Sequence, residues 1–534
     1  MPMTSPLAGL PPPPPPPPLA RRSSPEKERR VERLVERYRR ARDRRSAWES
    51  HWRECYDYAL PQREVLFGAE PGGKRTDRLF DGTAPDAVDQ LAASLLAELT
   101  PPWARWFGFE GGPGLSEEER TAIAPLLEEA AETVRVHFDR STFCVELHQC
   151  FLDLVTVGTA ALLFEEAPPG HASAFRFTAV PLTELVVEEG SAGRLDVTFR
   201  RSGLSVAVLR DRFPGAALPD TVVEQAERAP ETRFGVLEAV LPESHGYAYT
   251  AVLLGAEPDG GIGDGATPLP EGMTVLAEAQ FASSPFIIFR WLKVPGEAYG
   301  RSPVMKALPD IKTANKVVEL VLKNASISVT GIWQADDDGV LNPANIRLVP
   351  GAIIPKAVGS AGLTPLEAPG RFDVSQVVLD DLRRRIRHAL LADRLSQIDS
   401  PRMTATEVLE RSAQMARLLG ATFGRLQTEL LTPLVLRAVS ILRRRGEIPD
   451  VRVDGRMVDL QYRSPLARQQ AREDAQATLM WLEAVAGLGP EAAQAVDVAA
   501  AARWLGRALG VPPDLVRPDA APEAVPPEVL NVPV

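Results

Sequence analysis

The sequence predicts an α+β fold in which long helices precede and follow a strand-rich central region. Helical spacing of apolar residues dominates residues 25 to 158, and long helical stretches return after residue 303. Between them, residues 175 to 300 carry short alternating stretches separated by Gly, Pro and Asp, a pattern typical of antiparallel hairpins. At 534 residues, 45% hydrophobic and 25% charged, the chain can bury a large core and divide into several subdomains.

The N-terminal segment joins a proline run to a basic helix. Residues 1 to 24 include eight consecutive prolines, Pro11 to Pro18, which we expect to form an extended and unpacked tail. A helix is predicted to begin at Pro25, with Ser24 as its N-cap, and to end before Pro61. Its first part is basic: between residues 21 and 45, twelve Lys or Arg stand against five Asp or Glu. This fits either a solvated amphipathic helix or a basic surface that meets DNA or an acidic partner.

Three further helices and a strand are predicted before residue 170. Apolar residues recur at helical spacing over 84–99, 116–138 and 141–158, and Ser116 is placed to cap the second of these helices. A strand follows over 160–165. After the first of these helices, four aromatic side chains are expected to form one edge against the core: Trp103, Trp106, Phe107 and Phe109.

The central region contains six predicted strands with alternating apolar residues. Their ranges are 175–180, 195–200, 234–241, 247–254, 274–281 and 286–291.

The last of these strands leads into the most informative stretch of the chain. After a Gly/Pro turn comes the group Tyr299-Gly300-Arg301-Ser302-Pro303, and then a helix over 303–328. Ser302 suits the N-cap of this helix, and Pro303 its first position, where the missing N–H costs nothing.

Irregular and helical segments alternate beyond this helix. A Gly- and Pro-rich β stretch over 332–372 precedes a second helix over 374–391. Residues 393–403 break the pattern, and a long helix is then predicted over 404–445. Three residues make a kink in it expected: Gly420, Gly424 and Pro433.

The C-terminal part reads as a hairpin followed by helices. The hairpin is predicted within 451–462, around Asp454-Gly455. Ala-rich helices follow over 465–486 and 491–509, before a Pro-rich tail.

Composition argues against several classes of protein. The net charge of −11 argues against a protein that coats DNA, but not against one past which DNA slides, because dense Lys and Arg would grip the phosphates. Three cysteines are too few for a disulfide framework, and the six histidines form no metal-binding pattern, so we expect no metal and no other cofactor. No apolar run has the length of a membrane span, and the N-terminus does not look like a secretory signal.

One motif approaches a phosphate-binding loop without completing it. Gly68 to Thr76 nearly follows G-x4-G-K-[ST], but Arg75 stands where the Ser or Thr that holds magnesium is required. The preceding residues are not a convincing buried strand, and no helix begins at Lys74. We therefore expect a surface loop here, and no catalytic site in the chain.

Several segments, in collinear order, resemble the portal, or head-to-tail connector, proteins of short-tailed, podovirus-type double-stranded DNA bacteriophages. The most specific are YGRSP with the ALPDIKTAN that follows it, and MTATEVLER (Met403 to Arg411). LHQCFLDLVTVGTAALLFEE (Leu147 to Glu166), YRSPLARQQ (Tyr462 to Gln470) and LGVPPDLVRP (Leu509 to Pro518) are similar to further pieces of that family. The likeness extends over residues 30 to 520, and the proline run departs from it.

The resemblance implies a ring-forming subunit with an α/β wing, a two-helix stem, a β-rich clip, a channel loop and a helical crown. Composition predicts that residues 1–24 form a disordered Pro-rich tail. The segments that the resemblance implies are 25–300 as the wing, 301–330 as stem helix 1, 331–372 as the clip, 373–392 as stem helix 2, 393–403 as the channel loop, 404–462 as the long kinked helix and hairpin of the wing, and 463–534 as the crown and C-terminal tail.

The resemblance also implies a function without catalysis. A portal ring, dodecameric if this chain follows its family, sits at one capsid vertex, and double-stranded DNA is packaged and ejected through its channel. The implied partners are the terminase large subunit, the major capsid and scaffolding proteins, and tail adaptor proteins, with no membrane. The implied location is a virion, assembled in the host bacterial cytoplasm. The alternatives are another structural virion component, such as a minor capsid or head-tail adaptor protein, and a nucleotide-driven DNA-packaging enzyme, against which the incomplete phosphate loop argues.

Charged residues of the stem and channel loop are the candidate functional residues. At about 100° per residue, Lys312, Lys316 and Lys323 lie within about 40° of each other on stem helix 1, so a ring would repeat each as a circle of positive charge. The alternative is an ordinary solvated face or intersubunit salt bridges. The candidates for DNA contact in the loop are Arg394 and Arg402, and those for intersubunit pairing are Glu319, Asp380, Asp381 and Arg384.

Overall fold

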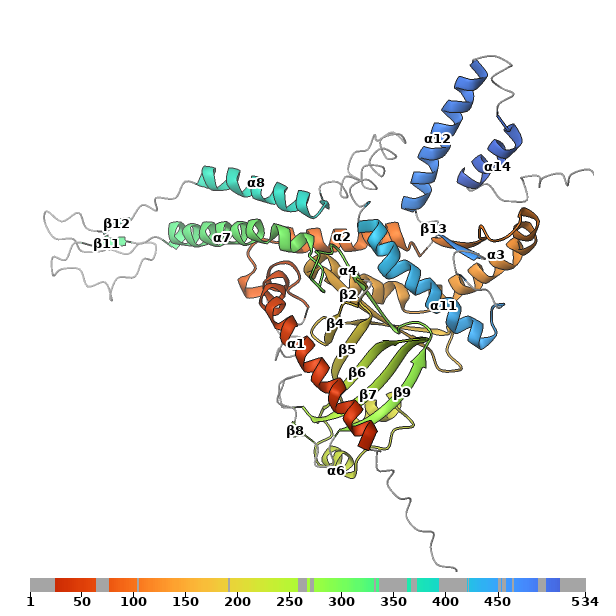
Figure 1. Cartoon of the computed structure of the whole chain (residues 1–534). Coiled ribbons are helices and arrows are strands. Elements are labelled where there is room, and N and C mark those ends of the chain that lie inside the picture. The colour runs from red at the N-terminus through yellow and green to blue at the C-terminus, as the bar shows by residue number, and fades with distance from the viewer. Residues whose placement is uncertain are drawn as a thin grey trace, which may run out of the picture.

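A central body of helices and strands carries a pair of long projecting helices on one side and a helical pair at another end (Figure 1). The projecting pair is α7 (Pro303–Thr330) and α8 (Phe372–Ala389), which lie side by side. The other pair is α12 (Pro465–Gly487) and α14 (Val498–Leu509). The computed structural model describes residues 25–63, 76–102, 105–190, 193–257, 267–268, 273–330, 333–335, 363–365, 372–392, 420, 422–449, 453, 458–462, 465–487 and 496–509. The mixed helix and strand content agrees with the predicted fold class.

The largest sheet has six antiparallel strands. Its order is β4–β5–β6–β7–β8, and β9 also pairs with β7. The strands are β4 (Leu185–Glu188), β5 (Val197–Leu204), β6 (Phe234–Glu243), β7 (Gly246–Ala256), β8 (Thr267–Pro268) and β9 (Thr274–Phe281). The predicted hairpin region is therefore confirmed, although β4 was not foreseen.

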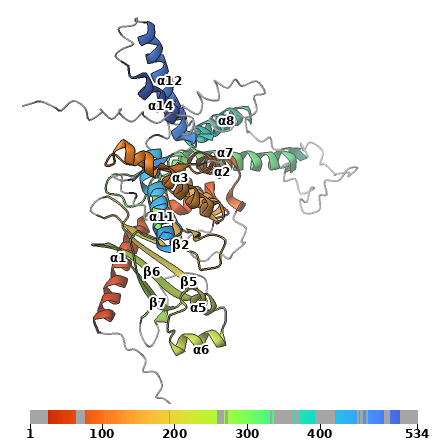
Figure 2. The ribbon, with the colours of Figure 1, turned by 90° about the vertical axis from the view of Figure 1, so that its right-hand side faces the viewer.

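Helices cover both faces of this sheet (Figure 2). On one face, the predicted apolar stripe of α1 (Pro25–Ala59) is buried against Phe199 and Leu237. On the other face, α5 (Val206–Arg212) and α6 (Asp220–Arg228) pack on alternate residues of β6. The sequence analysis missed α5 and α6, because two helices of seven and nine residues are too short for their periodicity to stand out.

A second sheet, β10–β2–β3, forms the centre of the main hydrophobic core. Its strands are β2 (Thr159–Glu166), β3 (Phe175–Val180) and β10 (Phe286–Arg290). It packs with α2 (Thr83–Leu99), α3 (Glu117–Asp139), which Ser116 caps as predicted, and α4 (Phe143–Val157).

The end of α4 and the start of α7 touch backbone to backbone. Gly158 ends α4 with φ of +79°, a conformation that favours glycine. A Cβ built on Gly158 would lie 2.5 Å from the carbonyl oxygen of Gly300, and one built on Gly300 would lie 2.2 Å from the carbonyl oxygen of Gly158. The predicted cap of α7 is confirmed, since the Ser302 hydroxyl accepts from the Met305 N–H at 2.9 Å; it also donates to the Thr156 carbonyl of α4 at 2.8 Å.

The predicted hairpin near residue 455 has a different partner. The strand β13 (Val458–Tyr462) pairs antiparallel with β1 (Phe107–Gly111), far away in the sequence, with Phe107 opposite Tyr462. A parallel bridge joins Val453 to Val458, and Asp454-Gly455 lies outside the described residues. The strand β1 belongs to the aromatic edge predicted around Phe107. Patterns within a few residues of β13 could not identify β1 as its partner.

The long helix contains a wide turn where a kink was predicted. Residues Gln427–Leu431 form a π-helical turn that leads into α11 (Thr432–Arg445), with Pro433 in its first turn. Such turns are a recognised cause of bending in helices. Residues 404–419 of the predicted helix lie outside the described part of the chain.

Several other predictions also fall outside the described residues. These are the tail 1–24, the loop from Gly68 to Lys74, the channel loop 393–403, and all of the clip except β11 (Trp333–Ala335), β12 (Leu363–Pro365) and the first residue of α8. Within the clip, β11 and β12 pair antiparallel.

Candidate functional site

The predicted lysine face of α7 consists of ion pairs within one chain. Lys316 and Lys323 both donate to Glu319, at 3.0 and 2.6 Å. These two hydrogen bonds lower the pKa of the Glu319 carboxyl, and the bond from Lys323 has the larger effect. Lys312 instead reaches Glu54 on α1 at 3.0 Å, and this contact raises the pKa of Lys312. The structure thus brings two of the three lysines together around one carboxylate, whereas Lys312 joins α7 to α1.

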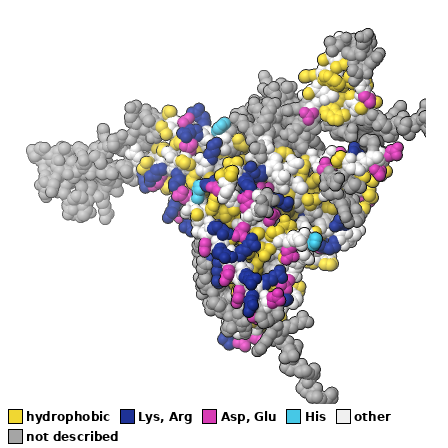
Figure 3. Space-filling view, in the orientation of Figure 1, with side chains coloured by type: hydrophobic (Ala, Val, Ile, Leu, Met, Phe, Trp, Pro, Cys, Tyr) yellow, Lys and Arg dark blue, Asp and Glu magenta, His cyan; other side chains and the backbone are white. Residues whose placement is uncertain are grey.

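The candidates on α8 are exposed and pair along their own helix. Arg384 donates to Asp381 at 3.1 Å, and Asp380 accepts from Gln376 at 3.0 Å. The Arg384 and Asp381 side chains are 75% and 55% exposed, so both remain accessible to a neighbour. Lys, Arg, Asp and Glu side chains are interspersed over this part of the surface (Figure 3).

Two ion pairs that the sequence analysis missed attach α8 to the rest of the molecule. Arg383 binds the buried Asp81 at 2.8 Å, and Arg385 binds Asp310 of α7 at 2.9 Å. Burial raises the pKa of Asp81, but hydrogen bonds from Thr83 and Arg383 outweigh it and hold the pKa below the usual 3.8. No local sequence signal identifies partners that lie about 300 residues apart.

Exposed apolar side chains lie on both α7 and α8. They are Leu320 and Leu322 on α7, 54% and 53% exposed, and Val377 and Val378 on α8, 71% and 45% exposed. Three other apolar residues of α8, Leu379, Leu382 and Ile386, are buried.

A buried arginine ties the strand before α7 to the long helix. The side chain of Arg290 on β10 is 1% exposed and donates to Glu429, in the π-helical turn, at 2.6 Å. Glu429 also accepts from the backbone N–H of Arg290 at 2.9 Å. The strand that precedes α7 and the π-helical turn that precedes α11 are therefore joined through one carboxylate.

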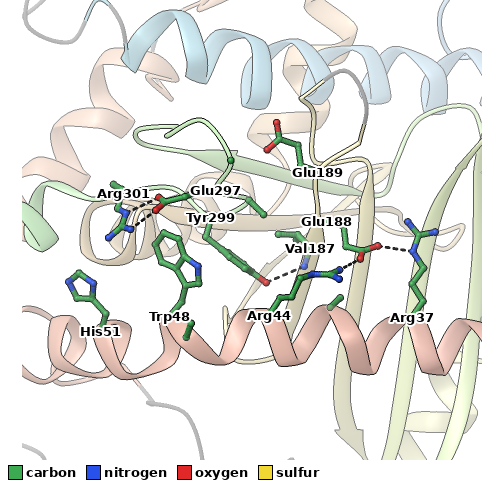
Figure 4. Close-up of a pocket in the computed structure, with 14 residues that line it drawn as sticks. Arg37, Arg44, Trp48, His51, Val187, Glu188, Glu189, Glu297, Tyr299 and Arg301 are labelled. Carbon is green, nitrogen blue, oxygen red and sulfur yellow. Dashed lines mark hydrogen bonds and ion pairs between the residues drawn. The ribbon is translucent and has the colours of Figure 1, made fainter.

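A groove of ≈ 700 Å³ lies between α1 and the turn that precedes α7 (Figure 4). Arg37 and Arg44 both reach Glu188 at the end of β4, and Arg301 pairs with Glu297. The sequence analysis did not anticipate this groove, because its walls come from three separate segments of the chain.

The predicted channel residues Arg394 and Arg402 lie outside the described residues. In the part of the chain that is described, no group of three or more His, Cys, Asp and Glu side chains is arranged to hold a metal ion. None of the described helices combines the length and apolar character needed to cross a membrane.

Comparisons with known proteins agree with the resemblance. The family model for the bacteriophage head to tail connecting protein matches residues 31–516. A probable portal protein of Bordetella phage BPP-1 is 26% identical over 511 residues, which cover 91% of this chain and 88% of that protein. The portal proteins of Enterobacteria phage T3 and Escherichia phage T7 are 24% and 23% identical over 429 residues, which cover 78% of this chain and 75% of each relative. This chain belongs to the bacteriophage head to tail connecting protein family, the phage portal proteins.

Proposed function

We propose that this chain assembles into a ring, dodecameric as the resemblance implies, through which double-stranded DNA enters and leaves a phage capsid. The observation that carries the proposal is the family match, which spans 31–516 and so includes the whole α7–α8 stem. The ring would sit at one capsid vertex among major capsid and scaffolding proteins. The terminase large subunit would dock on it during packaging, and tail adaptor proteins afterwards.

The exposed leucines of α7 support a ring in which this helix stands between two copies of itself. Leu320 and Leu322 are two residues apart, and at about 100° per residue they point about 160° apart around the helix. An apolar group on each flank suits a head-to-tail contact, in which one flank meets the opposite flank of the next copy and the arrangement closes. The polar row of Lys316, Glu319 and Lys323 lies between the two flanks.

The polar rows of the stem then have two roles in the proposal. Lys312, Lys316 and Lys323 form circles of charge in the channel wall, balanced in part by Glu319, together with Arg394 and Arg402 of the channel loop. The accessible groups on α8, Asp380, Asp381 and Arg384, pair with the neighbouring copy. Asp381 and Arg384 have each other within the chain, so assembly would exchange these partners instead of burying unpaired charges.

The remaining segments receive the roles implied by the family. Residues 25–300 and 404–462 would form the wing, 331–372 the clip, 393–403 the channel loop and 463–534 the crown. The subunit would act by geometry and charge, without a catalytic site. The alternative function is that of a minor capsid or head-tail adaptor protein. It is less favoured because it does not account for the projecting α7–α8 pair.

Electron microscopy of the purified chain tests the ring. We expect a closed ring with a central hole wide enough for duplex DNA; a chain that stays monomeric at high concentration would refute the proposal.

The contact through the leucines has its own test. Leu320→Asp combined with Leu322→Asp should prevent ring formation, whereas Leu126→Asp, an exposed leucine on α3, should not. If the Leu320/Leu322 variant forms rings as readily as the Leu126 control, these leucines do not form the contact between neighbouring copies.

The lysine row is tested in assembled particles. Replacing Lys312, Lys316 and Lys323 together by Gln should leave the ring intact and change the amount of DNA retained, because the circles of charge next to the phosphates are gone. Lys306→Gln, an exposed lysine on another side of α7, is the matched control. If the triple variant does not assemble, or retains DNA as the control does, these lysines have no channel role.

A further inference from the structure

One wall of the groove beside α1 is formed by residues on one face of that helix. Its α1 wall includes Arg37, Ala41, Arg44, Trp48 and His51. At 1.5 Å per residue, the distance from residue 37 to residue 51 is about 21 Å. Across the groove lie the end of β4 and the turn 296–301 (Figure 4). The shape suits an extended peptide better than a compact small molecule.

Several side chains that line the groove carry hydrogen-bond donors. Arg37, Arg44 and Arg301 bring guanidinium groups, and Trp48 an indole N–H, next to small apolar side chains such as Ala47. The Arg37 and Arg44 side chains are 43% and 64% exposed, so they retain accessible N–H groups beyond their pairs with Glu188. A ligand for this groove would be apolar and rich in acceptors.

A proline run has these properties. It has no backbone N–H, and its carbonyl oxygens only accept. Prolines in a polyproline II helix rise about 3.1 Å per residue, so Pro11 to Pro18 would extend about 25 Å, close to the length of the groove. Aromatic-lined grooves are a recurrent way of binding such helices. We propose that the groove between α1 and the turn 296–301 binds the octaproline segment of the same chain.

The tether has the right length. The six residues 19–24 join the run to α1, and at about 3.3 Å per residue they reach about 20 Å. The start of α1 lies about 18 Å from Arg37 along the helix axis. A chain that reverses at the start of α1 therefore places Pro18 beside Arg37 and Pro11 near His51, antiparallel to the helix.

The charges of the groove favour a neutral occupant. Glu188 is paired with Arg37 and Arg44, and Glu297 with Arg301, whose guanidinium also lies 4.4 Å from the ring centroid of Trp48. Burial and the nearby Arg301 lower the pKa of His51, which favours the uncharged form of its ring. Covering this wall with prolines would bury no unpaired charge.

A disulfide between the run and the groove tests the proposal. In the full chain with Cys144→Ser, which leaves the two buried cysteines in place, Pro14→Cys is combined with Ala47→Cys. Oxidised glutathione should form an intrachain 14–47 disulfide, visible as a faster band on a non-reducing gel. Pro14→Cys with Ser46→Cys is the matched control, because Ser46 is exposed but points about 100° away around α1. We expect crosslinking at position 47 to be at least tenfold faster.

A second variant separates binding from tethering. Replacing the other prolines of the run by Ser, with the tether length kept, should slow the 14–47 disulfide to the rate of the control. Equal rates at positions 46 and 47, or an unchanged rate with the serine run, would overturn the proposal. A 14–47 disulfide that forms only between copies would show that the occupant is a neighbour's tail and refute the assignment to the same chain. None of these outcomes depends on whether the ring forms.

Discussion

Glu429→Ala is expected to loosen the joint between β10 and the long helix. The substitution removes the acceptor of the Arg290 guanidinium, at 2.6 Å, and of the Arg290 backbone N–H, at 2.9 Å. The guanidinium would keep only two carbonyl contacts, both at 3.3 Å, and the carboxylate of Glu189 at 3.8 Å. Removing one partner of a buried pair costs about 3–5 kcal/mol, and the 20% exposure of Glu429 places the expected cost near the lower end, about 3 kcal/mol.

Amide hydrogen exchange is the suitable assay, because unfolding of a chain with several subdomains is not a two-state process. Amides of β10 and α11 should exchange about 100-fold faster in the variant, since each 1.4 kcal/mol is about tenfold. Glu319→Ala is the control, because this carboxylate pairs with the exposed Lys316 and Lys323, far from β10 in the sequence, and exchange in β10 should not change. An increase of less than tenfold for Glu429→Ala would refute the view that this pair holds the joint.

Three other substitutions test the attachment of the stem. Gly300→Ala should lower the melting temperature, because its Cβ would lie 2.2 Å from the carbonyl oxygen of the glycine that ends α4; unchanged melting would contradict this contact. Ser302→Ala should cost about 2–3 kcal/mol, from a lost N-cap and a buried carbonyl left without its donor, while Ser302→Thr should cost less; amide hydrogen exchange in the first turn of α7 measures both. The pKa of Asp81 is held down by Thr83 and Arg383, so its stabilising contribution is complete above the usual carboxyl range and is lost as pH falls through the lowered pKa. An acid titration monitored by near-UV circular dichroism should show this loss of stability in the wild type but not in Asp81→Asn. Identical titration curves for the two proteins would exclude a stabilising role of the Asp81 carboxylate.

Local signals in the sequence identified most helices and their caps. Ser116 and Ser302 each precede an apolar helical pattern, and both cap a helix in the structure. Four strands of the large sheet, β5, β6, β7 and β9, were found because alternation and turn residues are also local properties, whereas the short β4 and β8 were missed. The short helices α5 and α6 escaped notice because each provides barely two turns of periodicity.

Partners distant in the sequence could not be predicted. The strand β13 was assigned to a hairpin, yet it pairs with β1, and nothing within a few residues of Asp454-Gly455 indicates that choice. The helix that carries Lys312, Lys316 and Lys323 was predicted from the sequence, because periodicity is a local property, but the contact of Lys312 with Glu54 depends on how α1 packs. The groove beside α1 depends on the same packing, and so its lining could not be assembled from the sequence.

The pairing of β1 with β13 has a consequence for synthesis of the chain. About 350 residues separate the two strands, so a ribosome adding about 5–20 residues per second needs roughly 20–70 s between them. During that time the nascent chain presents the open edge of β1 and its two phenylalanines without their partner. The sheet formed by β1 and β13 can therefore be completed only after residue 462 has been synthesised, and until then a chaperone would have the edge of β1 to bind.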